Sequence, residues 1–302
     1  MRLYLFFKNN ILIFHLLLPP QNIISDMKRT LCLSLITISI LSIGCSKKLS
    51  TFTTHNMNGE CGFIVKTDPK MFDEDQGVGN SYTLVWPDKG MISKEAEKEL
   101  IIQTFGDSTA TTADEAAKRF LKNHWLDYDG IKAIHTQILD SIPYGPFCTH
   151  CDISNKVSQD SNLVTFTTFT DFYYAGAAHG TYTVEYLTYD RKKKRVVHLN
   201  DLVDTNRLGE VVLRAIEDLT VNKDVCDCVF DEYKNGQPII VPDNFFIDST
   251  RSTLNIVFQQ YDITPYACGL QTVVMPIYWL SKHRNLTPYA KELFGKGSYL
   301  EE

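Results

Sequence analysis

The spacing of apolar residues predicts helices in three internal segments. They recur at helical intervals over residues 93–105, 113–125 and 208–219. In the last segment Leu208, Val212 and Ile216 follow the i, i+3, i+4 rule that places them on one helix face. Thr112 and Glu115 have capping-box spacing ahead of the second segment, and Asp204 or Thr205 is expected to cap the third. A short helix over 288–294 is expected to end the fold.

Other segments have the alternation and composition of β-strands. Tyr182, Val184 and Tyr186 alternate with polar residues, which predicts a strand with one buried face. The basic run 191–195 follows and is interpreted as a solvated hairpin turn leading into 196–199. β-branched and aromatic residues predict further strands over 132–141, 163–174, 245–248, 254–261 and 272–280. Strands grouped in hairpins and helices in blocks favour an α+β fold, a mainly antiparallel sheet with helices packed against it.

The amino-terminal region has the features of an export signal. Met27, Lys28 and Arg29 precede an apolar run over 31–43, which has the length of a signal core and is too short for a membrane helix. Gly44 before Cys45 resembles a lipoprotein processing site, so residues 27–44 are expected to be a signal peptide and Cys45 the lipidated amino terminus. Secretion without lipid remains the alternative. Residues 1–26 fit neither role and are interpreted as an over-extended start.

This interpretation predicts a location and a charge. The chain after Cys45 would lie outside the cytoplasm on the cell envelope, anchored by lipid, and at the outer membrane if the cell has two membranes. Residues 46–58 are polar, so 45–58 is expected to be a lipidated tether. Loss of residues 1–44 changes the formal net charge from −6 to −9, because four basic residues and one acidic residue are removed. Such a charge favours cationic partners and does not favour nucleic acid.

Six further cysteines remain: Cys61, Cys148, Cys151, Cys226, Cys228 and Cys268. An even number in an oxidising compartment favours disulfides, but spacing does not determine which residues pair. A zinc site is the alternative, with Cys148, His150 and Cys151 joined by Cys226 and Cys228. The spacing of the second pair is atypical for zinc, so the sequence analysis assigns no metal.

Motifs for known catalysis are missing from the sequence. It has no His-Glu-x-x-His zinc helix and no Gly-x-Ser-x-Gly elbow, and the glycines at 77 and 79 lack the pattern of a phosphate loop. We therefore assign no catalytic residue and no cofactor, and binding is favoured over catalysis.

Two phrases carry a family resemblance. Tyr-Ala-Gly-Ala-Ala-His-Gly at 174–180 and Phe-Gln-Gln-Tyr-Asp-Ile-Thr-Pro-Tyr-Ala-Cys-Gly at 258–269 resemble signatures of an extracytoplasmic domain family of unknown function. That family occurs alone in bacterial lipoproteins, in the lysozyme-sensing anti-sigma factor (RsiV type), and as an accessory domain of peptidoglycan deacetylases. Ala177 stands where the family usually has its second glycine. The resemblance implies an amino-terminal accessory domain over 59–165 and an RsiV-like domain over 166–295.

The resemblance implies a lipid-anchored binding protein for a cationic protein such as lysozyme or for a cell-wall glycan. His179, Tyr174, Tyr261 and Tyr266 are the candidate ligand-binding residues, while a hydrogen-bonded His179 that fixes its turn is the structural alternative. Gly176 and Gly180 are expected to permit positive φ around that turn. An envelope carbohydrate-active or peptidoglycan-modifying enzyme with a cleft at His179, or a structural partner of another envelope protein, are the other functional hypotheses.

Overall fold

The computed structural model describes residues 6–8, 11–13, 51–65, 76–123, 150–160, 162–173, 179–250, 252–283 and 285–295. The chain divides into two compact units, Met1–Lys48 and Leu49–Glu302. In the first unit, β1 (Phe6–Lys8) pairs with β2 (Ile11–Ile13) as an antiparallel hairpin. All other elements belong to the second unit, which the rest of the description concerns.

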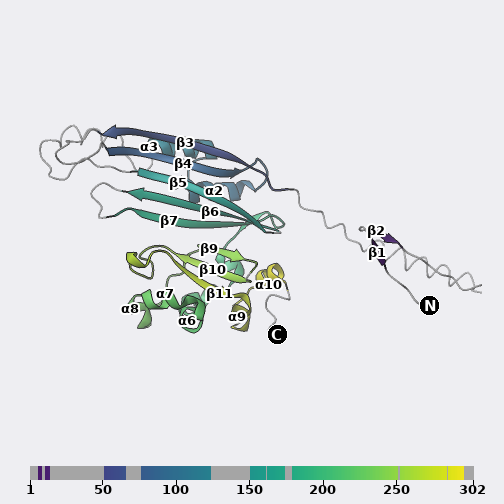
Figure 1. Ribbon diagram of the computed structural model, residues 1–302. Coiled ribbons are helices and arrows are strands. Elements are labelled where there is room, and N and C mark those ends of the chain that lie inside the picture. Colours follow the sequence, from purple (N-terminus) through teal and green to yellow (C-terminus); the bar gives the residue numbers. More distant parts are fainter. Residues whose placement is uncertain are drawn as a thin grey trace, which may run out of the picture. The chain divides into compact units, whose positions relative to one another are not determined.

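The second unit contains a six-stranded sheet of order β3-β4-β5-β6-β7-β8 (Figure 1). Four of its five pairings are antiparallel, and only β4 and β5 run parallel. Its strands are β3 (Thr54–Val65), β4 (Gln76–Pro87), β5 (His150–Asp160), β6 (Leu163–Tyr173), β7 (Thr181–Asp190) and β8 (Arg195–Val197).

A second, antiparallel sheet of order β11-β10-β9 lies beside β7 (Figure 1). It consists of β9 (Phe245–Asp248), β10 (Thr253–Phe258) and β11 (Gln271–Pro276). β10 is buried along its whole length, as expected for the central strand of a covered sheet.

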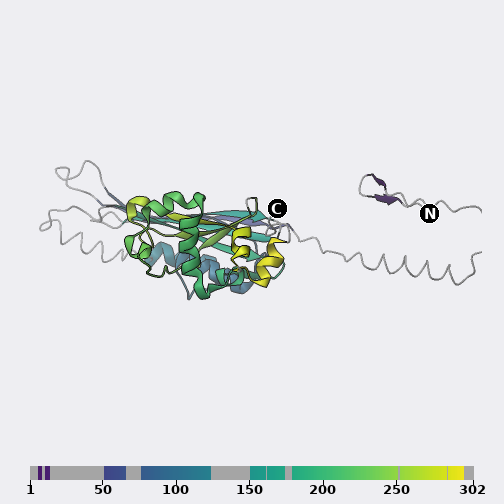
Figure 2. The same ribbon diagram turned by 90° about the horizontal axis from the view of Figure 1, so that it is seen from below.

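Two sets of helices bury the two sheets. α2 (Lys94–Phe105) and α3 (Ala113–Asn123) cover one face of the large sheet (Figure 2) and share a core with it around Leu100, Phe120 and Phe166. A second core around Val212, Ile256 and Leu280 lies between the small sheet and the remaining helices. These helices are α5 (Leu199–Leu202), α6 (Leu208–Asp218), α7 (Lys223–Cys228), α8 (Asp231–Lys234), α9 (Ile277–Lys282) and α10 (Pro288–Phe294).

The predicted α+β class is confirmed, with predominantly antiparallel sheets and helices packed on them. The helices expected over 93–105, 113–125, 208–219 and 288–294 are present as α2, α3, α6 and α10. Thr112 Oγ1 accepts the Glu115 amide proton at 3.2 Å, but the Glu115 carboxylate binds the amide of Thr111 instead of closing the box on Thr112. Asp204, one of the two residues expected to cap α6, instead caps the short 3-10 turn Thr205–Arg207 that precedes it, and α6 itself begins after Arg207.

Two strand predictions were wrong at their ends. The strand expected over 272–280 stops at Pro276, where α9 begins with Ile277. Proline has no amide hydrogen to donate to a ladder, and its fixed φ suits a helix start. The strand expected over 254–261 ends at Phe258, because Tyr261 has a left-handed backbone with φ 69°.

The domain boundary expected between residues 165 and 166 falls inside β6. β6 pairs along its whole length with β5 on one side and over most of it with β7 on the other, so one hydrogen-bonded sheet continues through this position. The last five residues of the predicted tether, 54–58, belong to β3 because they pair in register with β4.

Several predictions concern residues outside those described, namely the signal peptide with Cys45, the strand over 132–141, Cys148, Tyr174 and Gly176. Within the described part of the chain, every helix is too short or too polar to span a bilayer.

Candidate functional site

His179 and Gly180, the described end of the first phrase, meet the second phrase at the start of β7. His179 and Tyr266 stack with ring centroids 3.7 Å apart, and Tyr261 lies 5.8 Å from Tyr266 between centroids. The Tyr266 hydroxyl donates to the Gly180 carbonyl at 2.7 Å, and the same carbonyl lies 2.9 Å from Nδ1 of His179. We call the three rings of His179, Tyr261 and Tyr266 the ring stack.

The ring stack presents aromatic surface to solvent. His179 is exposed, and Tyr261 is 60% exposed. Tyr261 also has φ of 69°, a conformation that costs a non-glycine residue about 1–2 kcal/mol. An exposed tyrosine held in an unfavourable backbone conformation is a feature found at binding sites. The expectation of positive φ at Gly180 was wrong, since that residue is absent from the positive-φ glycines of the described chain.

Two amide side chains, Gln259 of the same loop and Asn244 just before β9, join the two sheets. Gln259 accepts from the Val184 amide at 3.3 Å and donates to the Val184 carbonyl at 2.8 Å. Asn244 accepts from the Tyr186 amide at 2.9 Å and donates to the carbonyls of Val184 and Val257. These two side chains hydrogen-bond to backbone groups on the edge of β7 that β8 does not cover. They therefore join the two sheets next to the ring stack.

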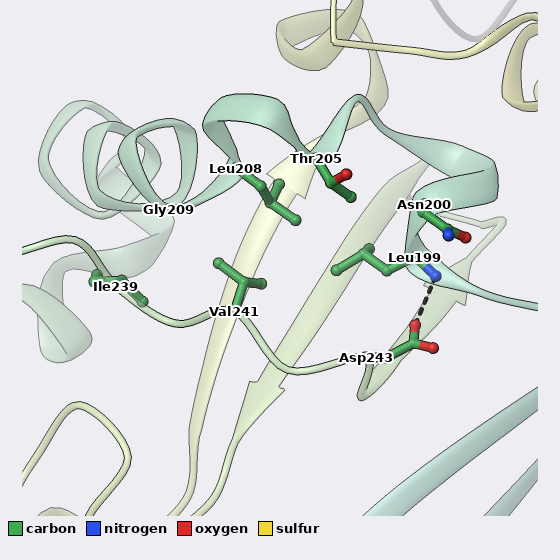
Figure 3. Close-up of a pocket in the computed structure, with 8 residues that line it drawn as sticks. All are labelled: Leu199, Asn200, Thr205, Leu208, Gly209, Ile239, Val241 and Asp243. Atoms are coloured by element: carbon green, nitrogen blue, oxygen red, sulfur yellow. Dashed lines mark hydrogen bonds between the residues drawn. The ribbon is translucent and has the colours of Figure 1, made fainter.

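Two adjoining hollows share Asp243. The larger, about 320 Å³, lies between α5, α6 and the segment 239–243, and its lining mixes apolar residues such as Leu199 and Val241 with polar ones such as Thr205 (Figure 3). Asp243 accepts from the Leu199 amide at 2.6 Å and from Nδ1 of His198 at 2.8 Å.

The smaller hollow, about 240 Å³, lies beyond Asp243 and is acidic. Glu99, Glu185 and Asp243 line it together with His198. Nε2 of His198 lies 3.6 Å from Glu99, so the imidazole bridges α2 and the loop before β9. Burial raises the pKa of the Glu185 carboxyl, because desolvation disfavours its charged form. Sequence reasoning missed this hollow, since its acids come from three separate segments.

The described members of the zinc site considered from the sequence, among which Cys148 is not included, do not come together. His150 and Cys151 are neighbours on β5 and therefore point to opposite faces of the sheet. Cys151 is buried, and burial raises its pKa to about 12, so its thiol is a poor metal ligand. Cys228 and Cys268 are in thiol contact, and their hydrogen bond raises the pKa of Cys228. Cys61 is exposed on β3, and Cys226 is partly buried on α7.

The basic run 191–195 is folded back on the protein. Lys192 and Lys193 pair with Glu292 of α10, and Arg195 pairs with Asp201 at 2.7 Å. The guanidinium of Arg191 lies over the Phe52 ring. Most of this positive charge is therefore used within the molecule, as expected for a hairpin turn.

The comparisons with known proteins identify a domain and a fold. The family model described as a protein of unknown function, DUF3298, matches residues 206–278. These residues include the second phrase and most of the residues that line the larger hollow. A comparison with curated proteins gave no match.

One solved structure of a DUF3298 family member has a similar fold. The crystal structure of a DUF3298 family member from Bacteroides fragilis gives a TM-score of 0.57 at 17% identity, covering 84% of this chain and 100% of that one. A DUF3298 family protein from Pseudomonas aeruginosa gives 0.49 at 16% identity, covering 80% and 97%. The chain is thus an α+β protein in which residues 206–278 match the DUF3298 model, a domain of unknown function for which no catalytic role is evident.

Proposed function

We propose that the chain is a lipid-anchored envelope protein that binds a cationic protein through the ring stack. The observation that carries the proposal is the exposed Tyr261, which an unfavourable backbone conformation holds beside the stacked rings of His179 and Tyr266. Aromatic faces attract lysine and arginine side chains, and tyrosines are frequent energetic anchors of protein interfaces.

The charge around the ring stack supports a cationic partner. Residues 179–184 and 258–269, which adjoin the rings, contain no lysine or arginine, whereas they contain Asp262. Asp262 follows Tyr261 directly and is exposed. A basic protein that approaches the rings therefore meets negative charge and no described cation from these segments.

The binding test uses the full chain in detergent with lysozyme as the cationic probe. We expect binding that weakens with salt, and Tyr261→Ser should weaken it at least about tenfold, as for a central interface tyrosine. Tyr278→Ser is the matched control, because Tyr278 is 46% exposed on α9 and lies outside the ring stack. Equal affinities for the two variants, or retention on purified peptidoglycan with none on lysozyme, would contradict the proposal.

The anchor is tested separately. Metabolic labelling with a palmitate analogue should mark the wild-type protein, and Cys45→Ser should abolish the label and the membrane fraction. If the Cys45→Ser protein still carries the label, the lipid is attached to another residue and the proposed anchor at Cys45 is wrong.

A further inference from the structure

A mixed histidine and carboxylate cluster lies on the large sheet, on the face that α2 and α3 leave uncovered. His150 and Asp152 alternate on β5, so both point to the same face, and Asp171 of β6 lies directly opposite Asp152. One ligand atom from each residue lies within 4.8 Å of the other two. Nε2 of His150 is 3.4 Å from Oδ2 of Asp171.

The two carboxylates form a like-charged cross-strand pair. Like charges directly opposite each other destabilise a sheet. In the described part of the chain, the only ion-pair partner of either carboxylate is His150, which is charged only when protonated. A bound divalent cation would remove this repulsion and hold the three side chains together.

Neighbouring residues orient two of the three ligands. The Ser81 hydroxyl of β4 donates to Oδ1 of Asp152 at 2.5 Å, which leaves Oδ2 available. Tyr173, the cross-strand partner of His150, has its ring nearly parallel to the imidazole, at an interplanar angle of 19° with centroids 6.1 Å apart. Such supporting contacts fix the geometry of metal ligands before the ion binds.

We propose that His150, Asp152 and Asp171 bind a divalent transition-metal ion. Zinc lies about 2.0–2.2 Å from nitrogen and oxygen ligands, so ligand atoms around one ion are up to about 4 Å apart. The present separations therefore need only small rotations of side chains that are 39% exposed in His150 and 44% in Asp171. The imidazole favours zinc, copper, iron or nickel over calcium and magnesium, which prefer oxygen ligands alone. Three protein ligands leave at least one coordination position for water or another ligand.

The test is zinc titration of the full chain in detergent by calorimetry, with cysteines alkylated beforehand. We expect one zinc per chain and a higher unfolding temperature with zinc than with chelator. Asp171→Asn and His150→Gln should each weaken binding at least tenfold and abolish the zinc-dependent stabilisation. Ser81→Ala should weaken it by about tenfold, the effect typical of an outer-shell partner.

Asp160→Asn is the matched control, because Asp160 is an exposed aspartate at the other end of β5 on the same face. It should bind zinc as the wild type does. In chelator, Asp171→Asn should be no less stable than the wild type, since it removes a repulsion. Absence of zinc binding by the wild type, or binding that Asp171→Asn and His150→Gln leave unchanged, would overturn the proposal.

Discussion

At the scale of single residues, Tyr261 combines local strain with exposure. Its φ of 69° is unfavourable for any side chain with a Cβ, and its ring is mostly in solvent. Burial of the Tyr261 ring therefore contributes little free energy to folding. The hydrogen bonds of Gln259 with Asp262 and with Val184 must hold the loop in this conformation.

We expect Tyr261→Gly to raise the free energy of unfolding by about 0.5–1 kcal/mol, because glycine accepts positive φ without the Cβ clash. Urea denaturation would measure the change. Tyr278→Gly should instead lower the free energy of unfolding by about 1 kcal/mol, because Tyr278 lies in helix α9 and glycine is a poor helix former. A destabilised Tyr261→Gly protein would show that the ring contributes more through packing than the backbone loses through strain.

Glu185 is a second residue in an unfavourable environment, because burial disfavours its ionised form. Because burial raises its folded pKa above the unfolded value of about 4.3, the protonated form is favoured in the folded protein. The resulting loss of stability is absent below the unfolded pKa and grows as the pH rises through the folded pKa.

Glu185→Gln should therefore stabilise the protein at neutral pH and lose this advantage near pH 4. Thermal unfolding of both proteins across that range would measure the difference. Glu217→Gln on α6, which changes an exposed glutamate, should show no comparable trend. A gain for Glu185→Gln that did not depend on pH would argue against desolvation as its cause.

At the scale of elements, α6 shows how packing can override helix propensity. Gly209 lies in its first turn, where a Cβ would approach the Ile239 carbonyl oxygen to 2.4 Å. The close approach brings the segment 239–243 against α6 and forms one wall of the larger hollow (Figure 3).

Gly209→Ala should destabilise the protein by about 2 kcal/mol, although alanine is the better helix former by about 1 kcal/mol. Chemical denaturation would report the loss. Glu217→Ala, at an exposed position of the same helix, should stay within about 0.5 kcal/mol of the wild type. Stabilisation by Gly209→Ala would mean that the segment at Ile239 can move away freely.

At the scale of the whole molecule, the described unit depends on how its two sheets are joined. Gln259 and Asn244 of the small-sheet region supply hydrogen bonds that a neighbouring strand would otherwise provide to β7. The ring stack lies close to this contact, because Gln259 belongs to the same loop between β10 and β11 as Tyr261 and Tyr266.

We expect Gln259→Ala to lower the free energy of unfolding by about 2 kcal/mol, because the Val184 amide loses its side-chain partner and the Val184 carbonyl keeps only the one from Asn244. The change should also weaken binding at the ring stack. Gln237→Ala, at an exposed position after α8, is the control and should have little effect. Equal unfolding midpoints for the two variants would show that the joint does not depend on this side chain.

The sequence predicted elements whose signals are local. Helices α2, α3 and α6 and strand β7 have apolar spacing that their own residues display, and that spacing is sufficient to place them. β3 escaped prediction because it is an edge strand with mostly exposed residues and lacks a clear alternation. α9 was predicted as strand because β-branched and aromatic residues occur there, and only Pro276 signalled the change.

The sequence by itself determined the α+β class, the main helices and the presence of two distinctive phrases, because each of these depends on neighbours along the chain. Only the tertiary structure decided that the phrases meet around Gly180, that Glu185 and Asp243 share a hollow, and that His150 faces Asp171 while Cys151 faces the core. These relations depend on strand order and register, which bring together residues as many as eighty-six positions apart.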